Sequence, residues 1–312
     1  MQVWRSLEDV PTDVAPSVVT VGNFDGIHRG HRHVFARCRE VAGLRGLGSV
    51  VAVTFDPHPM AVLRPEHAPS MLTTIDARLE LLAAAGVDAT LVLPFDLEMA
   101  SWSPAEFVRR VLVGALHAGA VVVGANFRFG HRAAGDVATL RDLGDELGYA
   151  TEPIVLDGGP QVWSSTYVRH CLAAGDVTGA EEALGRPFAI RGRVVRGDQR
   201  GRDLGFPTAN IPIGPGLSAP ADGVYAGWLT RTDSGEVSPV AISVGTNPTF
   251  DGERERRVEA HVIDGSSPEL YGVEVDVSFV HRLRGMARFD DLDKLVAAMD
   301  DDVRRSRELL RD

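Results

Sequence analysis

Short apolar runs rich in β-branched residues recur through the first half of the chain. They lie at residues 18–21, 50–53, 90–93 and 120–123. Runs of this length without polar alternation are typical of strands that are buried on both faces of a parallel sheet. Between them, the pattern predicts helices near residues 31–44, 76–85 and 104–112. Alternation of this kind predicts a doubly wound, Rossmann-like α/β domain that runs from residue 17 to about residue 185.

One of these predicted helices carries a start signal. Ser103 is an expected N-cap, Pro104 fits the first helical position, and Glu106 is placed to complete a capping box.

The pattern changes after Arg186 and Pro187, where strand-like runs follow one another without helices between them. These runs lie at residues 190–195, 223–230, 240–244, 258–263 and 273–279. Glycine and proline clusters separate them, which indicates a small all-β barrel or sandwich. A last helix is expected at about residues 292–310. Residues 175–186 are expected to link the two domains.

Composition and charge agree with a two-domain globular protein and argue against a nucleic-acid partner. The 312 residues are more than one compact core usually holds, and a net charge of -11 lacks the basic footprint of a nucleic-acid binder. Charged residues interrupt the N-terminal segment early, so we expect no signal peptide, and we expect no membrane partner. The two cysteines, Cys38 and Cys171, fit a cytoplasmic location.

The basic residues restrict the possible phosphate chemistry. Lys294 is the only lysine, and it lies in the expected C-terminal helix. The sequence therefore argues against a P-loop lysine and against a Schiff-base lysine. Phosphates must be held by arginine, histidine, backbone N–H groups, helix N-termini or a metal ion.

The first candidate site is a glycine-rich segment, residues 22–31, that directly follows the first predicted strand. In open α/β sheets, ligands bind beyond the carboxyl ends of strands, and the start of the next helix attracts anions. His28 and His31 are three residues apart and can together donate hydrogen bonds to phosphate oxygens. A glycine-rich turn with surface histidines and a histidine metal pair are the alternatives, although no HExxH spacing supports zinc.

The HxGH pattern in this segment resembles the adenylyltransferase module of bacterial bifunctional riboflavin kinase/FAD synthetases. Further motifs of that family follow in order, namely TFDPHP at 54–59, GANFRFG at 124–130 and SSTYVR at 164–169. The resemblance implies that His28, His31 and Arg169 act on the ATP phosphates. It also implies an ATP site that includes Gly22, Asn23, Phe24, Asp25, Gly30, Ser164, Ser165 and Thr166. The flavin-side residues that it implies are Phe55, Asp56, Asn126 and Phe127.

These motif residues also have ordinary structural interpretations. Core packing explains the phenylalanines without a flavin, and helix capping explains Ser165 and Thr166 without a nucleotide.

The second candidate site lies at the start of the β-rich half. Thr208 and Asn210 are two residues apart, so on an extended segment their side chains point the same way. A hydroxyl and an amide oxygen suit Mg²⁺ that is bound together with ATP phosphates. Gly197 and Gly201 flank an arginine-containing loop that could fold over those phosphates, and Arg202, directly after this loop, is a further predicted phosphate ligand. Taken alone, a Thr-x-Asn pair is more often turn chemistry.

The longer string GRDLGFPTAN at residues 201–210 resembles the riboflavin kinase module of the same family. The resemblance implies that Glu259, in the segment VEAH, accepts the proton of the riboflavin 5′-hydroxyl. An exposed carboxylate paired with Arg256 or Arg257 is the alternative. One departure is Met286, which stands where relatives often carry an acidic residue. A flavin-side hydrogen bond or a carboxylate partner for an arginine is therefore expected to be missing there.

Together these features predict a bifunctional enzyme. Residues 1–185 would form the FMN adenylyltransferase domain, and residues 186–312 the riboflavin kinase domain. Riboflavin, FMN and ATP would be its substrates, Mg²⁺ its cofactor, and FMN and FAD products rather than prosthetic groups. We expect a monomer or a weak homo-oligomer. The alternatives are an enzyme with one inactive module, a nucleotidyltransferase for pantetheine phosphate or a cytidylyl acceptor, and a flavin sensor without catalysis.

Overall fold

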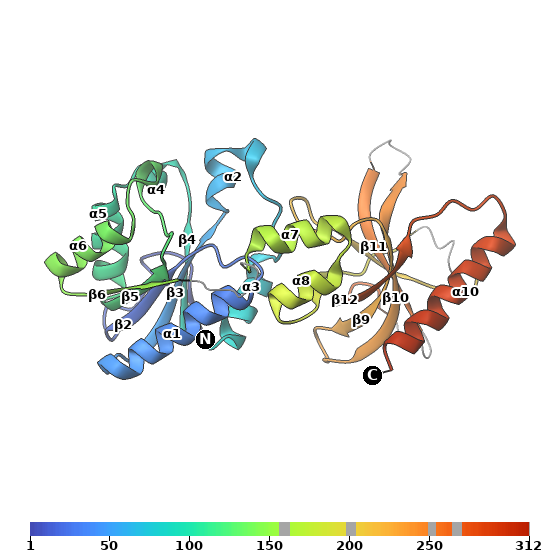
Figure 1. Ribbon diagram of the computed structural model, residues 1–312, viewed down its shortest axis with the longest axis horizontal. Coiled ribbons are helices and arrows are strands. Elements are labelled where there is room, and N and C mark those ends of the chain that lie inside the picture. Colours follow the sequence, from blue (N-terminus) through green and yellow to red (C-terminus); the bar gives the residue numbers. More distant parts are fainter. Residues whose placement is uncertain (156–162, 198–203, 249–253, 264–269, 312) are drawn as a thin grey trace. The chain divides into compact units, whose positions relative to one another are not determined.

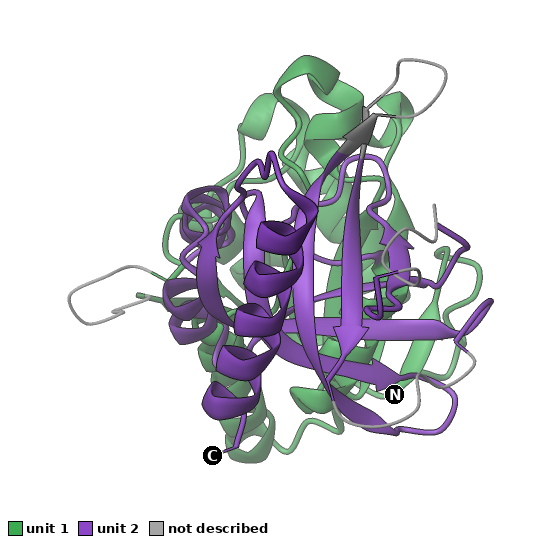
Figure 2. Ribbon diagram, turned by 90° about the vertical axis from the view of Figure 1, so that its right-hand side faces the viewer, with its two compact units in different colours: residues 1–70, 75–163 green, residues 71–74, 164–312 purple. Residues whose placement is uncertain are grey.

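The computed structural model describes residues 1–155, 163–197, 204–248, 254–263 and 270–311 (Figure 1). The chain divides into two compact units, shown in different colours in Figure 2. Unit 1 comprises residues 1–70 and 75–163, and unit 2 comprises residues 71–74 and 164–312. Each unit has its own β-sheet and its own buried hydrophobic residues.

Unit 1 is built on a six-stranded sheet in the order β1-β4-β3-β2-β5-β6, and all of its pairings are parallel. The strands are β1 (Gln2–Trp4), β2 (Ser17–Val21), β3 (Ser49–Asp56), β4 (Ala89–Pro94), β5 (Ala118–Gly124) and β6 (Ala150–Ile154). The four predicted strands are confirmed as β2 to β5. The two edge strands, β1 and β6, were not predicted, because they are short and only partly buried.

Helices pack on both faces of this sheet. They are α1 (Arg29–Arg45), α2 (Pro59–Leu63), α3 (Ile75–Ala84), α4 (Leu97–Ala100), α5 (Pro104–Phe107) and α6 (Val137–Leu147), with a π-helix over Val108–Ala115 after α5. Successive strand residues point to opposite faces, so Val18 packs with α1 residues such as Val34, whereas Val19 packs with Val111 of the π-helix. This double covering confirms the predicted doubly wound domain.

The predicted start of α5 is only partly correct. The Ser103 hydroxyl accepts a hydrogen bond from the Glu106 N–H at 3.2 Å, and Pro104 is the first helical residue. The Glu106 carboxylate, however, lies 2.8 Å from Arg110 one turn later. Glu106 therefore forms an ion pair with Arg110 instead of completing the capping box.

Unit 2 contains a six-stranded antiparallel sheet in the order β7-β12-β9-β10-β11-β8. Its strands are β7 (Phe188–Arg193), β8 (Ala209–Pro212), β9 (Gly223–Arg231), β10 (Val237–Pro248), β11 (Arg254–Val262) and β12 (Glu274–Gly285). Val195, just beyond β7, donates its N–H to the Asn210 carbonyl of β8 at 2.9 Å. This bond brings the two ends of the sheet together, so the predicted small barrel is confirmed in a nearly closed form.

Among its described residues, unit 2 also contains the helices α7 (Ser165–Ala174), α8 (Val177–Leu184) and α10 (Leu292–Leu309). The expected linker at residues 175–186 is a wrong prediction, because α8 occupies it. Val177, Ala180, Ala183 and Leu184 recur at helical spacing and are buried, so this segment is part of the core of unit 2. The predicted C-terminal helix is confirmed as α10.

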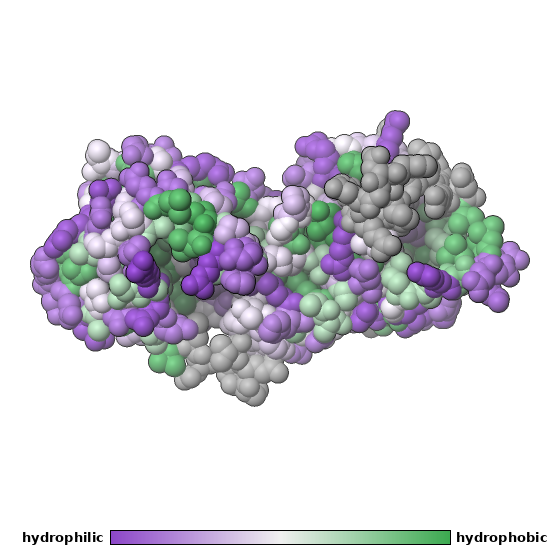
Figure 3. Space-filling view, turned by 90° about the horizontal axis from the view of Figure 1, so that it is seen from above, coloured by the Kyte–Doolittle hydropathy of each residue, from purple (hydrophilic) through white to green (hydrophobic). Residues whose placement is uncertain are grey.

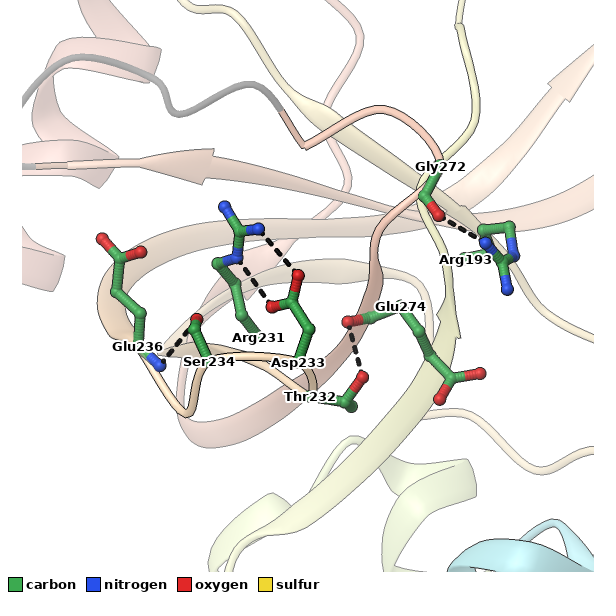
Figure 4. Close-up of polar contacts among 8 residues, drawn as sticks. All are labelled: Arg193, Arg231, Thr232, Asp233, Ser234, Glu236, Gly272 and Glu274. Atoms are coloured by element: carbon green, nitrogen blue, oxygen red, sulfur yellow. Dashed lines mark hydrogen bonds and ion pairs between the residues drawn. The ribbon is translucent and has the colours of Figure 1, made fainter.

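Polar contacts fix the end of the barrel where β9 turns into β10 (Figure 4). Arg231 holds Asp233 through two hydrogen bonds of 3.0 and 2.9 Å, and the Thr232 hydroxyl donates to the Glu274 carbonyl of β12. On the neighbouring strand, Arg193 donates to the Gly272 carbonyl (Figure 4). The Thr232 bond ties the hairpin to β12, and the Arg193 bond ties β7 to the segment that leads into β12.

The surface is largely hydrophilic on the face shown in Figure 3, where apolar residues gather in small separate patches. Within the described ranges, no helix has the length and the apolar character needed to cross a membrane.

Candidate active sites

The first site lies at the point where the strand order of unit 1 reverses. From β2 the chain adds β3 and β4 on one side, and then adds β5 and β6 on the other. Ligands of open α/β sheets bind in the crevice at such a switch point, beyond the carboxyl ends of the strands. The loop after β2, which carries residues 22–28, and the loop after β5, which carries Asn126, are both at these ends.

His28 and His31 form a stacked pair at the start of α1. Their ring centroids are 3.6 Å apart and the ring planes differ by 26°. His28 is the N-cap of α1, and its Nδ1 accepts a hydrogen bond from the His31 N–H at 3.4 Å. Since Nδ1 is the acceptor, the neutral ring carries its proton on Nε2, which can therefore donate to a ligand. The predicted pairing of the two imidazoles is thus present, at a helix start that favours anions.

Both rings are neutral at physiological pH. Burial lowers the pKa of His28 to about 4. Burial, followed by the nearby His28 ring and Arg78, lowers the pKa of His31 well below its ordinary value. The Nδ1 atom of His31 is buried and has no hydrogen-bond partner among the described residues. The pair therefore offers neutral N–H donors and one unsatisfied polar atom, a set that a phosphate could complete.

At position 30, between the two histidines, glycine is needed because there is no room for a side chain, and not because of the backbone φ angle. A Cβ at this position would lie 3.1 Å from the His28 ring and 3.2 Å from the Trp163 carbonyl oxygen. Neither neighbour can withdraw easily, because one is a stacked ring and the other is backbone. Trp163 directly precedes Ser164, so the SSTYVR segment begins one residue after a group that touches the histidine turn.

Acidification should destabilise unit 1 through His28. The pKa of His28 is about 4 in the folded protein and 6.5 in the reference state, so between these values the unfolded chain binds a proton that the folded chain does not. The free energy of unfolding should therefore fall as the pH drops below 6.5, by about 2 kcal/mol at about pH 5 from this group. Denaturant unfolding at about pH 7.5 and about pH 5 measures this loss.

A His28→Asn variant tests the assignment, because asparagine preserves the N-cap but does not titrate. Its pH-dependent loss of stability should be smaller than that of the original chain by about 2 kcal/mol. The matched control is His33→Asn, at an exposed histidine of the same helix. An unchanged pH dependence in His28→Asn would contradict the assignment.

Asn23 is held next to a second histidine. Its side-chain amide nitrogen lies 2.9 Å from His58 Nε2, and its backbone carbonyl accepts a hydrogen bond from the Thr54 hydroxyl at 3.1 Å. His58 is the N-cap of α2, where its Nδ1 accepts from the Met60 N–H at 3.1 Å. The TFDPHP motif after β3 is thereby joined to the glycine-rich loop after β2.

The predicted flavin-side residues lie at the carboxyl ends of β3 and β5. Phe55 and Phe127 are half-buried and both pack against the same hydrophobic cluster beside the sheet. Asp56 and Asn126 are exposed. These two strand ends flank the end of β2 in the sheet, which is compatible with a shared ligand, and the roles of the four residues stay predictions.

The predicted residues of the SSTYVR segment open helix α7 in unit 2. Ser164 is the N-cap, and its hydroxyl accepts a hydrogen bond from the Tyr167 N–H at 3.1 Å. Ser165 and Thr166 are the first two helical residues, and Arg169 follows one turn later. Capping therefore falls on Ser164 rather than on Ser165 or Thr166.

The second site is a row of side chains that crosses the barrel of unit 2. Asn210 on β8 pairs with Glu259 on β11, and Glu259 pairs with Ser243 on β10. The row continues through Val224 on β9 to Arg284 on β12. Directly paired residues of antiparallel strands project from the same face, so these side chains are neighbours. The alternate residues Val258 and Ala260 project from the opposite face of β11 and are fully buried.

Thr208 and Asn210 form the oxygen-bearing end of this row. The Asn210 amide donates to the Thr208 hydroxyl at 3.3 Å, so the two side chains are adjacent as predicted. A Cβ on Gly197 would lie 2.5 Å from the Asn210 amide carbon, which means that the Gly197 backbone covers Asn210 closely. A hydroxyl and an amide oxygen beside a carboxylate fit Mg²⁺, which takes few protein ligands. Gly201 and Arg202, also predicted here, lie outside the described residues.

Specific contacts bear on two expectations for this region. Arg256 pairs with Asp222, at 2.9 and 3.0 Å. Pairing of Glu259 with Arg257 therefore stays as the alternative to a catalytic role. Arg284 pairs with Asp302 of α10, with its shortest contact at 2.6 Å, so this arginine has a carboxylate partner although Met286 replaces the expected acid. Met286 itself is 55% exposed, and its methyl carbon packs over Gly245.

Four residues of these sites were not predicted as site residues, namely His58, Arg78, Ser243 and Arg284. His58 belongs to the TFDPHP motif, so the sequence could have indicated it as a site residue. The other three depend on strand register or on burial, which single residues in a sequence do not reveal.

Comparisons with known proteins agree with both halves. Residues 10–163 match the family described as FAD synthetase, and residues 184–310 match the family described as riboflavin kinase. Bifunctional riboflavin kinase/FMN adenylyltransferases match along nearly the whole chain. The Escherichia coli (strain K12) protein is 38% identical over 93% of this chain and 92% of its own length, and that of Pseudomonas fluorescens is 38% identical over 99% and 98%.

A solved structure agrees with the fold over the same extent. A crystal structure described as a macrolide-efflux protein from Streptococcus pneumoniae has a TM-score of 0.87 and 31% sequence identity, and covers 98% of both chains.

Proposed function

The chain belongs to the bifunctional riboflavin kinase/FMN adenylyltransferase family, and we infer from the two sites how it performs both reactions. It phosphorylates riboflavin to FMN with ATP, and then adenylylates FMN with ATP to yield FAD and pyrophosphate. We assign the adenylyl transfer to the histidine pair of unit 1 together with the Ser164–Arg169 segment. We assign the phosphorylation to the Asn210–Glu259 row of unit 2.

In adenylyl transfer, a phosphate oxygen of FMN attacks the α-phosphorus of ATP. The new P–O bond forms while the bond to the β-phosphate oxygen breaks, and pyrophosphate leaves with the electron pair. Negative charge grows on that leaving group, so donors placed there accelerate the step. The Nε2–H of His28, the His31 ring and the start of α1 are suited to this role. Ser165, Thr166 and Arg169 would hold the rest of the triphosphate.

In the kinase reaction, the riboflavin 5′-hydroxyl attacks the γ-phosphorus of ATP, and ADP leaves as the bond to the β-phosphate oxygen breaks. Glu259 would accept the hydroxyl proton. Its place beside Asn210 puts the proposed base next to the proposed phosphate site, and this pairing is the observation that carries the assignment. Positioning and charge neutralisation supply most of the rate in such transfers.

Mg²⁺ is part of the proposal for unit 2. Thr208 and Asn210 would hold it together with ATP phosphates, where it would neutralise charge on the transferred group. The backbone at Gly197 would cover the same phosphates.

The proposal extends to the organisation of the protein. We retain residues 1–185 and 186–312 as the two functional modules, since the riboflavin kinase match begins at residue 184. A cytoplasmic location is supported by Cys38 and Cys171, which are both free thiols. A monomer or a weak homo-oligomer remains our expectation.

Incubations of the purified protein with each flavin test both activities. The purified protein, given riboflavin, ATP and Mg²⁺, should produce FMN first and FAD later, as separated by chromatography. Given FMN and ATP, it should produce FAD without riboflavin. A chelator should stop the riboflavin step, because the Thr208–Asn210 site would lose its ion.

Other outcomes of these incubations identify the alternatives. Accumulation of FMN without FAD would indicate one inactive module. Tight retention of unmodified riboflavin without ATP turnover would indicate a flavin sensor and would overturn the proposal.

A further inference from the structure

Arg78 is a buried cation beside the histidine pair that no motif includes. It lies on α3 and is 4% exposed, and its Nη2 is 3.8 Å from Oδ1 of Asp25, which is 2% exposed. Burying either charge alone is strongly unfavourable, so each stabilises the other in the folded protein. Asp25 belongs to the loop that presents His28. The ion pair therefore connects α3 to the proposed catalytic loop.

The loop that Arg78 contacts is in a strained conformation. Phe24 and Ile27 have φ angles of 47° and 45°, and Gly26 has a φ of 80°. Positive φ is unfavourable for a bulky residue, and most of all for a β-branched one, so the surroundings must hold this loop in place.

Helix α3 supplies much of that support. Its Leu79 and Leu82 share a buried cluster with Phe24 and Ile27, on either side of Asp25. The loop is thus held by apolar contacts on both sides and by an ionic contact in the middle. This conformation places the His28 ring on the His31 ring.

The charge of Arg78 also acts on the pair directly. The pKa of His31 is lowered first by burial, then by His28 and then by Arg78. Among the described residues, the charged and titratable groups around His31 are His28 at the N-cap of α1, Arg78 on α3, and Asp25 behind Arg78. Arg78 thus helps to keep His31 neutral, while it adds positive potential next to the proposed phosphate site.

We propose that Arg78 is a positioning residue for adenylyl transfer, which holds the strained loop through Asp25 so that His28 stays stacked on His31 beside the ATP phosphates. This inference rests on the proposed role of the histidine pair. Arg78 need not touch the nucleotide, because a small displacement of the two rings would weaken their donation to the leaving pyrophosphate.

Steady-state FAD formation in the full-length protein tests the inference with three variants. Arg78→Met should lower kcat about 10-fold to 100-fold, as expected for displaced catalytic groups, with little change in the KM for FMN. Arg78→Lys keeps a buried cation and should recover most of that loss. Because Arg78→Met removes the cation that faces the buried Asp25 and is expected to destabilise unit 1, the neutral double variant Asp25→Asn/Arg78→Met is included and should show the same loss of kcat. Riboflavin phosphorylation should be unchanged in all three.

A histidine NMR titration adds a readout that lost stability alone would not move. The pKa of His31 should rise in Arg78→Met and stay low in Arg78→Lys, because the positive charge disfavours protonation. Arg109→Met is the matched control, since it breaks an exposed ion pair with Glu146 in the same unit. It should alter neither kcat nor the titration.

The outcomes separate this inference from the proposed function. Normal kcat in the folded double variant, or an unshifted His31 titration in Arg78→Met, would overturn the role of Arg78. Continued FAD synthesis after both histidines are replaced would instead overturn the site itself.

Discussion

Replacement of both His28 and His31 by alanine should abolish the conversion of FMN to FAD, while riboflavin is still phosphorylated and FMN accumulates. The two rings are stacked with their centroids 3.6 Å apart at a helix start. We propose that they stabilise the negative charge that develops on the leaving pyrophosphate. Removal of one such donor typically costs about 10²-fold to 10³-fold in kcat, so loss of both should reduce it by about 10³-fold or more. Chromatography of flavins after incubation with FMN and ATP measures the effect.

Two further variants make this result specific. His33→Ala replaces an exposed histidine of the same helix and should leave FAD formation intact. His28→Asn keeps the N-cap but removes the imidazole, so a low activity in this variant would exclude simple loss of the helix start as the cause. FAD synthesis at a normal rate by the double alanine variant would refute the first site.

Replacement of Glu259 by alanine should have the opposite effect, with loss of FMN formation and continued FAD synthesis from supplied FMN. The carboxylate is the only proposed proton acceptor of the kinase site, and general-base catalysis contributes about 10²-fold to 10⁴-fold. Glu259→Gln should be similarly impaired, because it preserves the shape of the row but cannot accept the proton. An assay of ADP release with riboflavin and ATP measures the rate.

The control for Glu259 is another strand carboxylate of the same barrel. Glu274→Gln changes an exposed side chain on β12, remote from the row that runs from Asn210 to Arg284, and should leave the kinase rate unchanged. Undiminished riboflavin phosphorylation by Glu259→Ala would refute the second site.

The sequence predicts the central elements of the fold well, because their burial leaves a clear pattern. Runs such as Val50–Val53 are apolar throughout, since both faces of β3 are covered by helices. Edge strand β1 gives no such pattern. Helix α8 was mistaken for a linker because glycines flank it, although its alternation of Val177, Ala180 and Leu184 is helical. Gly175 and Gly185 suggested turns, and the helical spacing of apolar residues between them extends over only eight residues.

Site residues could be predicted from the sequence where they lie within one contiguous motif. They could not be predicted where the fold brings together residues that are far apart in the sequence. The spacing of His28 and His31, and that of Thr208 and Asn210, already implies side chains that meet. Ser243 and Arg284 join Glu259 only through the register of four adjacent strands. Arg78 is one of many helical arginines in the sequence, and only its burial against Asp25 distinguishes it.

The hydrogen bond from Val195 to Asn210 has a further consequence for the behaviour of the protein in solution. Strand β8 is short, and without this partner its backbone would offer free donors and acceptors to any extended peptide. Such open edges promote pairing between copies of a chain, and hence aggregation. By pairing Val195 with Asn210, the barrel engages part of this edge with its own backbone and so limits self-association there.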